Sequence, residues 1–142
     1  MIPLTMIKKM KGKDKINELE KIYGSLKKLK KLFEKDDENM LLYSDLEDWE
    51  YFINHPNEEI EEGKTIFIEN KNLGQIELEL IKTIKKNSPG SISELSRLTQ
   101  RDVSNLQRKV DKLEAEGLIS FKKGLKNRKI PIVNYDKIEI TI

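Results

Sequence analysis

The stretch from Ser91 to Gly117, SISELSRLTQRDVSNLQRKVDKLEAEG, constrains the fold most, because it contains two short helical patterns joined by a tight connection. The first pattern has three apolar residues at helical spacing: Ile92, Leu95 and Leu98. The second has four, spaced three, four and three residues apart: Val103, Leu106, Val110 and Leu113. Ser91 and Glu94 form a capping-box pattern, and Thr99 and Asp102 repeat its spacing. Gly117 then occupies a C-cap position, which predicts a helix from Arg101 to Glu116.

The flanking segments extend this helix pair into a larger motif. Upstream, residues 73–86 carry a helical stripe that ends at the linker Asn-Ser-Pro-Gly of residues 87–90. Downstream, the pattern changes to period two, which predicts strands at 118–121 and 130–133. The eight residues between these strands include five cations, a Gly and an Asn, as is typical of a hairpin that contacts phosphates. The alternative is a basic loop that is merely solvated. The whole arrangement predicts a winged helix-turn-helix over residues 73–142.

The helix from Arg101 to Glu116 is the candidate DNA-recognition helix, because its exposed side has side chains suited to base edges. Arg bonds guanine in a bidentate manner, Asn does the same with adenine, and Ser serves either role. The candidate contacts on this helix are Arg101, Ser104, Asn105, Arg108, Lys109 and Lys112. The candidate phosphate contacts on the wing are Lys122, Lys123, Lys126, Asn127, Arg128 and Lys129. The competing interpretation is an ordinary solvated helix face; the lack of acids at 101, 104, 105 and 108 favours DNA.

Composition excludes several other classes of function. The 142 residues contain no Cys and a single His, so neither disulfides nor a Cys/His metal site is expected. No apolar run is long enough to span a membrane, and the N-terminus does not fit a signal peptide, so we expect a cytoplasmic protein. Nucleotide-binding and catalytic motifs are missing, so we expect neither a cofactor nor an enzyme. Asp36, Asp37 and Glu38 offer carboxylates for Mg²⁺, but adjacent loop carboxylates more often face solvent.

Residues 1–72 are expected to form an N-terminal extension. Residues 1–9 alternate as in a strand, and Pro3 would place that strand at an edge. A long helix is predicted over residues 13–33, with a seam of five apolar residues: Leu19, Ile22, Leu26, Leu29 and Phe33. This seam packs either on its own domain or against a second subunit, and we favour a homodimer. Beyond it we expect a strand at 40–43, a helix holding the aromatic residues of 46–53, an acidic loop at 57–63, and a strand at 64–69. Residues 70–72 should lead into the next helix, and residues 135–142 alternate as in a further strand or an extended tail.

Charge is segregated along the chain although the net charge is only +2. Residues 8–31 carry ten Lys against three acids, and residues 34–62 carry twelve acids against one Lys. Residues 101–129 are again basic, with nine Lys or Arg against four acids. Such segregation indicates that different surfaces meet different partners, although the acidic middle is equally well explained as a solvated surface.

Residues 75–142 resemble the archaeal MarR-like winged-helix regulators, a group described as DNA-binding. The resemblance rests on SISELSRLTQRDVSNLQRKVDKLEAEGLISF and on the end RKIPIVNYDKIEITI, where the family has a similar basic-Pro-Val-Tyr-Asp-x-Ile-x-Ile pattern. SDLEDWEYF resembles the acidic-aromatic segment before the winged unit, whereas NEEIEEGKTIFIENKN is longer than the family's counterpart. The resemblance implies transcriptional regulation. Some members look like the antitoxin partner of a small toxin, which would make the acidic middle a protein-binding surface.

The expected fold is therefore α+β and mainly helical, a winged helix-turn-helix with an N-terminal helical and strand extension. The expected function is sequence-specific binding of double-stranded DNA by a transcriptional regulator that represses or autoregulates. The alternative is a winged-helix interaction module, such as an antitoxin-like adaptor, that binds a partner protein through residues 34–62.

Overall fold

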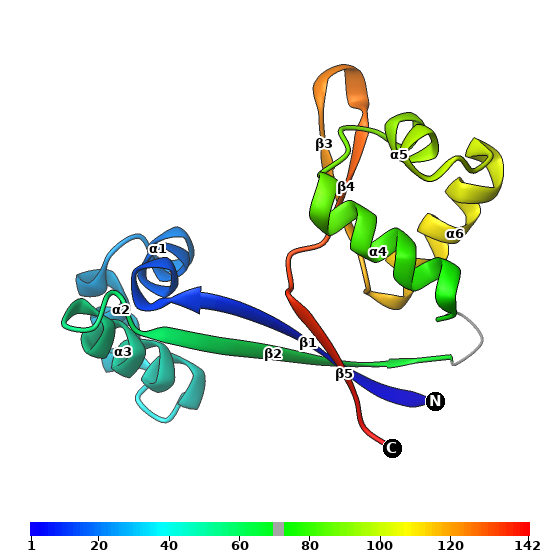
Figure 1. The fold of residues 1–142 in the computed structure, drawn as a ribbon. Helices are drawn as coiled ribbons and strands as arrows, with labels where there is room; N and C mark the ends of the chain where they lie inside the picture. Colours follow the sequence, from blue (N-terminus) through cyan, green and yellow to red (C-terminus); the bar gives the residue numbers. More distant parts are fainter. Residues whose placement is uncertain (70–72) are drawn as a thin grey trace. The chain divides into compact units, whose positions relative to one another are not determined.

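The computed structural model describes residues 1–69 and 73–142, which form an α+β structure with helices α1–α6 and strands β1–β5 (Figure 1). The chain divides into two compact units. The smaller unit comprises Lys9–Glu62, and the larger comprises Met1–Lys8 with Gly63–Ile142. The division therefore falls elsewhere than the expected boundary between residues 72 and 73. The physical reason is that residues 2–8 and 63–68, which precede that boundary, lie in strands that pack with the larger unit.

The smaller unit contains α1 (Gly12–Tyr23), α2 (Leu26–Lys35) and α3 (Met40–Ile53). Its core holds Leu19, Leu29 and Trp49, with five partly buried apolar residues around them: Ile16, Tyr23, Leu26, Leu42 and Leu46. The prediction of one long helix over 13–33 is wrong. Gly24 adopts a φ of +91°, which ends α1, and the Ser25 hydroxyl accepts the N–H of Lys28 at 3.2 Å, which starts α2.

The start of α3 also differs from expectation. Residues 40–43 were expected to form a strand, but they are the first turn of α3. The Asn39 side-chain oxygen accepts the N–H groups of Leu41 at 3.0 Å and Leu42 at 3.2 Å, so Asn39 caps the helix and overrides the local strand preference. The rest of the predicted helix is confirmed, including the burial of Trp49 and Phe52.

A three-stranded sheet of order β2-β1-β5 is formed by β1 (Ile2–Lys11), β2 (Glu59–Ile68) and β5 (Lys137–Ile140). Residues 2–8 of β1, residues 63–68 of β2 and all of β5 belong to the larger unit, and the remaining residues of β1 and β2 belong to the smaller one. Strand β1 is central, so its predicted edge position is wrong. Its antiparallel register with β5 runs from Leu4↔Ile140 to Ile7↔Lys137, and Pro3 lies just outside it, where its missing N–H breaks no bond of that ladder. Strand β2 begins inside the expected acidic loop, and β5 confirms the strand expected near the C-terminus.

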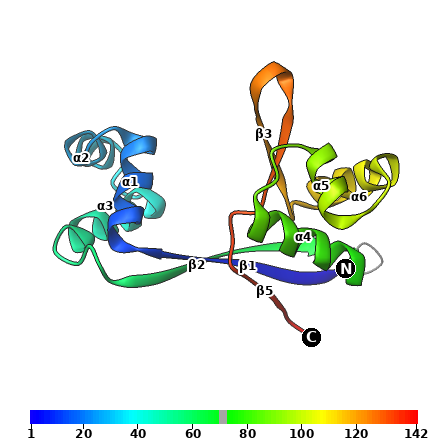
Figure 2. The same ribbon diagram turned by 45° about the horizontal axis from the view of Figure 1, so that its top comes forward.

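Helices α4 (Gln75–Asn87), α5 (Ile92–Thr99) and α6 (Val103–Glu116) confirm the three predicted helices. The predicted start of the third at Arg101 is wrong, because Asp102 is the N-cap and Arg101 precedes the helix. The β3–β4 hairpin, Ser120–Lys123 and Lys129–Ile132, confirms the predicted strand pair and projects beyond these helices (Figure 2). The Ser91 hydroxyl accepts the N–H of Glu94 at 3.1 Å, as predicted. The second predicted capping box is wrong, because Thr99 lies in α5 and Asp102 itself caps α6. The expected lead-in at residues 70–72 lies outside the described residues.

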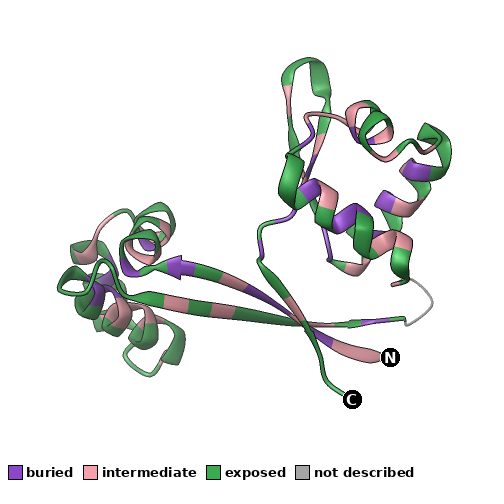
Figure 3. Cartoon of the chain, viewed as in Figure 1, coloured by how far each residue is buried: buried purple, intermediate pink, exposed green. Residues whose placement is uncertain are grey.

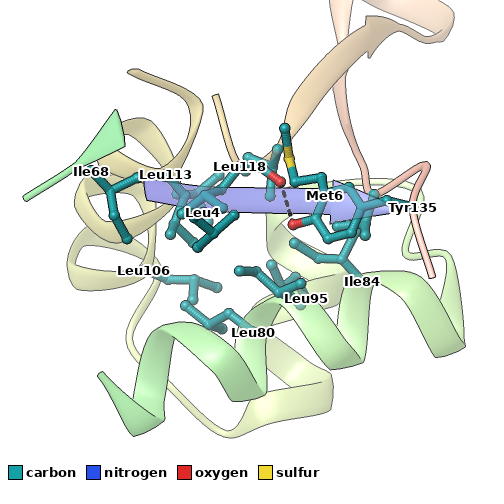
Figure 4. Close-up of a cluster of buried hydrophobic side chains, with 14 residues drawn as sticks. Leu4, Met6, Ile68, Leu80, Ile84, Leu95, Leu106, Leu113, Leu118 and Tyr135 are labelled. Atoms are coloured by element: carbon teal, nitrogen blue, oxygen red, sulfur yellow. Dashed lines mark hydrogen bonds between the residues drawn. The ribbon is translucent and has the colours of Figure 1, made fainter. Parts of the chain in front are cut away.

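The core of the larger unit lies between the sheet and the helices (Figures 3 and 4). Leu4 and Met6 of β1 pack with Leu80 of α4, Leu95 of α5 and Leu106 of α6. The other buried members are Ile68, Ile81, Ile84, Val110, Leu113, Leu118, Ile119, Val133 and Tyr135. The Tyr135 hydroxyl donates to the Leu118 carbonyl oxygen at 2.6 Å, which ties the chain after β4 to the chain before β3. This core fixes the rotation of α6.

No helix in the described ranges is both long and apolar enough to cross a membrane.

Candidate nucleic-acid interface

Helix α6 exposes the side that carries most of the predicted recognition residues. Leu106, Val110 and Leu113 are buried and hold the helix to the core. Four residues on the other side are exposed: Ser104, Asn105, Arg108 and Lys112. Within residues 1–69 and 73–142, none of these four side chains has a hydrogen-bond or ion-pair partner. Val103 was expected to be buried, but it is 45% exposed because α6 starts at this residue, at the margin of the core.

The exposed residues share one open depression on the surface of the larger unit. It is lined by Gln100, Arg101, Asp102, Asn105, Arg108, Lys109 and Lys112. Five of the six residues predicted for the recognition helix therefore lie together, and Ser104 lies beside them in the first turn of α6. A depression lined by four cations, two carboxamides and one carboxylate has a positive balance, which is suited to a polyanionic partner.

Two of the predicted contact residues are engaged by acids of α4. The Lys109 ammonium lies 3.1 Å from Glu77 Oε1, and the Arg101 guanidinium lies 3.8 Å from Glu79 Oε2. Burial alone would raise the pKa of Glu77, but hydrogen bonds from backbone N–H groups and from Lys109 outweigh it and lower that pKa. Glu77 is therefore ionised at neutral pH. No local sequence pattern predicts either ion pair, because the partners are far apart along the chain.

The acids on α6 itself are partly occupied by local hydrogen bonds. The Asp102 carboxylate accepts the N–H of Asn105 at 3.2 Å, as a helix cap does. The Asp111 carboxylate accepts a hydrogen bond from the Gln107 side chain at 2.9 Å. Neither of these two carboxylates forms an ion pair with Arg108 or Lys112.

The β3–β4 hairpin displays all six residues predicted for it on exposed positions: Lys122, Lys123, Lys126, Asn127, Arg128 and Lys129. The Lys129 ammonium lies 5.7 Å from the centre of the Phe121 ring, a cation–π distance. Lys126 and Asn127 adopt positive φ in the short 3-10 turn Leu125–Asn127, which shapes the tip. Leu125, not predicted as part of the site, is 87% exposed at that tip.

The smaller unit has a polar cluster that sequence reasoning missed. Lys15 forms an ion pair with Glu62, and the Tyr23 hydroxyl donates to Asp45 at 2.5 Å. The hydrogen bond to Asp45 and burial raise the pKa of Tyr23 to about 12, and burial raises the pKa of Asp48. Burial would lower the pKa of Lys15, but the hydrogen bond and charge of Glu62 raise it overall. These contacts join α1, α3 and β2 of this unit.

The described residues contain no group of three His, Asp or Glu arranged to hold a metal ion. Asp36, one of the three adjacent carboxylates considered above, accepts a hydrogen bond from the Asn39 side chain at 3.1 Å. His55 lies just beyond α3, with its ring stacked on Tyr51 at a centroid distance of 4.1 Å. These residues are thus engaged in local contacts.

In a comparison with known protein families, residues 73–140 match a family model described as HVO_A0114. The matched range begins before α4 and ends with β5, and so contains α6 and the hairpin. The name of that family states no activity. No curated protein matches the chain, and no solved structure matches it.

Proposed function

We propose that residues 73–142 form a winged helix-turn-helix that binds double-stranded DNA, with α6 as the recognition helix and the β3–β4 hairpin as the wing. The protein would regulate transcription in the cytoplasm, as a repressor or autoregulator. The proposal assigns it no catalytic step and no cofactor.

One observation carries this proposal: the exposed side of α6 presents Asn105, Arg108 and Lys112 without side-chain partners among the described residues, and a strongly basic hairpin follows α6 in the same unit. On an exposed helix face, a cation and an acid three or four residues apart are close enough to pair. Asp111 and Glu116 lie at these spacings from Arg108 and Lys112, but neither cation forms an ion pair among the described residues, and the hairpin adds five further cations. Concentrated positive charge with a few planar hydrogen-bonding groups matches the chemistry of a duplex groove.

The chemistry of recognition divides among these side chains. Arg108 is suited to guanine O6 and N7, and Asn105 to adenine N6 and N7, each worth about 1–3 kcal/mol of discrimination. Ser104 supplies a hydroxyl that donates or accepts. Lys112 and the hairpin cations would bind phosphates and raise the affinity for DNA regardless of its sequence.

We further propose that the protein acts as a homodimer that occludes its site, with two recognition helices in successive major grooves about 34 Å apart. The apolar seam on α1 and α2 packs largely within its own chain, because Leu19 and Leu29 are buried in the core of the smaller unit. The dimer interface would therefore lie elsewhere. Sedimentation at micromolar concentration tests the dimer: a single species of 16.6 kDa contradicts it, and one of twice that mass supports it.

Selection of bound sequences from a pool of random duplexes tests the DNA-binding proposal. We expect enrichment of a motif with two half-sites separated by about one helical turn. Recovery of no enriched motif, together with no gel shift at low salt, contradicts the proposal. Binding without enrichment would show a sequence-independent DNA binder and would contradict the recognition role of α6.

A second candidate is an adaptor that binds a partner protein through the acidic residues 34–62 of the smaller unit. The observation that favours it is the exposure of apolar residues at both ends of α3, Met40 and Leu41 at its start and Ile53 at its end, in this acidic stretch. Exposed apolar residues rimmed by charge are typical of protein-binding surfaces. A mutant with Leu41→Ser and Ile53→Ser separates the two functions: an adaptor loses its partner, whereas duplex binding by the larger unit is unchanged.

A further inference from the structure

Two acids of α4, Glu77 and Glu79, contact cations of the candidate DNA surface, and the two contacts differ in length and in exposure. Glu77 is only 16% exposed, and its second carboxylate oxygen accepts the N–H of Gly74 at 3.1 Å while the first binds Lys109. Glu79 is 57% exposed, its contact with Arg101 is longer, and it also accepts a hydrogen bond from Gln75. Both acids are contacted at both oxygens, but Glu77 is less exposed and its ion pair is shorter, whereas the contact of Glu79 with Arg101 has the exposure and length of a weak surface ion pair.

The contact with Glu77 restricts Lys109. The Lys109 side chain is 34% exposed and its ammonium lies on the carboxylate of α4, whereas Lys112, one turn further along α6, is exposed and has no partner among the described residues. A cation releases a counterion from DNA only when it neutralises a phosphate. Lys109 must give up Glu77 to do so, and a carboxylate held rigidly beside the surface also repels phosphates.

We propose that Glu77 is a positioning residue of the DNA-binding surface that holds Lys109 away from the phosphate backbone and so weakens the sequence-independent part of binding. This inference rests on the proposed function. It implies that Lys109 and Lys112, although adjacent on one helix face, differ in their contribution to the salt dependence of binding. Base recognition by Asn105 and Arg108 is unaffected by Glu77.

The test measures duplex affinity between 50 and 200 mM salt, on a selected duplex and on a scrambled one. Each phosphate contact changes the slope of log K against log salt by about 0.9. We expect Lys112→Gln to flatten the slope by about 0.9 and Lys109→Gln to flatten it much less. Glu77→Gln should steepen the slope by about 0.9 on both duplexes, so its gain in affinity over the wild type should fall about 3.5-fold across this salt range. In a protein that already carries Glu77→Gln, adding Lys109→Gln should flatten the slope of log K against log salt by the full value of about 0.9.

Glu139→Gln is the matched control, because it removes one negative charge from an exposed position on β5 of the same unit. Gln at position 77 retains an oxygen for the Gly74 N–H, so α4 should stay capped, which thermal unfolding checks. Equal effects of Glu77→Gln and Glu139→Gln, or equal flattening by Lys109→Gln and Lys112→Gln, overturn the inference. The latter comparison does not depend on substituting Glu77. A wild-type protein that binds neither duplex refutes the proposed function itself, and the inference with it.

Discussion

Replacing Tyr135 with phenylalanine removes one hydroxyl from the core of the larger unit and leaves the aromatic ring in place. The hydroxyl is buried and donates to the Leu118 carbonyl oxygen at 2.6 Å. Burial raises the pKa of Tyr135 to about 12, so the hydroxyl stays protonated and donates at all physiological pH values. Because Leu118 is buried as well, its carbonyl oxygen would lose this donor without access to water.

The expected cost follows from that unsatisfied carbonyl. Leaving one buried acceptor without a partner costs about 1–3 kcal/mol, so the free energy of unfolding of the larger unit should fall by this amount. For a unit of this size each kcal/mol corresponds to a fall of about 4–8 °C in Tm. The packing of the ring is unchanged, so no cavity contributes to the loss.

Urea denaturation followed by far-UV circular dichroism measures this loss. The fluorescence of Trp49, the single Trp of the sequence, reports the smaller unit and serves as an internal reference. Tyr51→Phe is the matched control, because its hydroxyl is exposed and donates to Glu58 at 3.0 Å; it should change stability by less than about 0.5 kcal/mol. A Tyr135→Phe protein as stable as this control would refute the reasoning.

Three further substitutions test other contacts by the same denaturation assay. Lys15→Met should lower the free energy of unfolding by about 0.5–1 kcal/mol, since Glu62 is partly exposed. Because the pKa of Lys15 is raised in the fold, this difference in stability between wild type and variant is full below pH 10.5 and shrinks as the pH rises above it. A pH-independent difference contradicts this. Gly24→Ala should cost about 1–2 kcal/mol in the Trp49 transition, because φ is +91° there. Asp102→Ala should lower the free energy of unfolding by about 1 kcal/mol, because it removes the N-cap of α6. An unchanged stability would contradict the capping role of Asp102.

The sequence was sufficient to predict α4, α5, α6 and the β3–β4 hairpin, because their signals are local. Apolar spacing, the cap at Ser91 and Gly117, and the change to period two each act over a few residues. The exposed side of α6 followed from the same spacing. The winged-helix assignment and its DNA target remain proposals.

The failures come from two sources. The apolar spacing of residues 13–33 fits one long helix and two shorter helices equally well. Only the pair Gly24–Ser25 signals the break between α1 and α2. The central place of β1 and the ion pair of Lys109 with Glu77 depend on residues distant in sequence, 32 positions apart in the second case. Local patterns carry no information about such pairings.

The most direct test of the recognition role of α6 compares three variants on a selected duplex and on a scrambled one. Asn105→Ala and Arg108→Ala should each weaken binding to the selected duplex by about 1–3 kcal/mol and change binding to the scrambled duplex much less. Lys126→Ala, on the hairpin, should weaken both equally and flatten the salt dependence by about 0.9. Equal losses on both duplexes for all three variants would contradict a base-contacting role for α6.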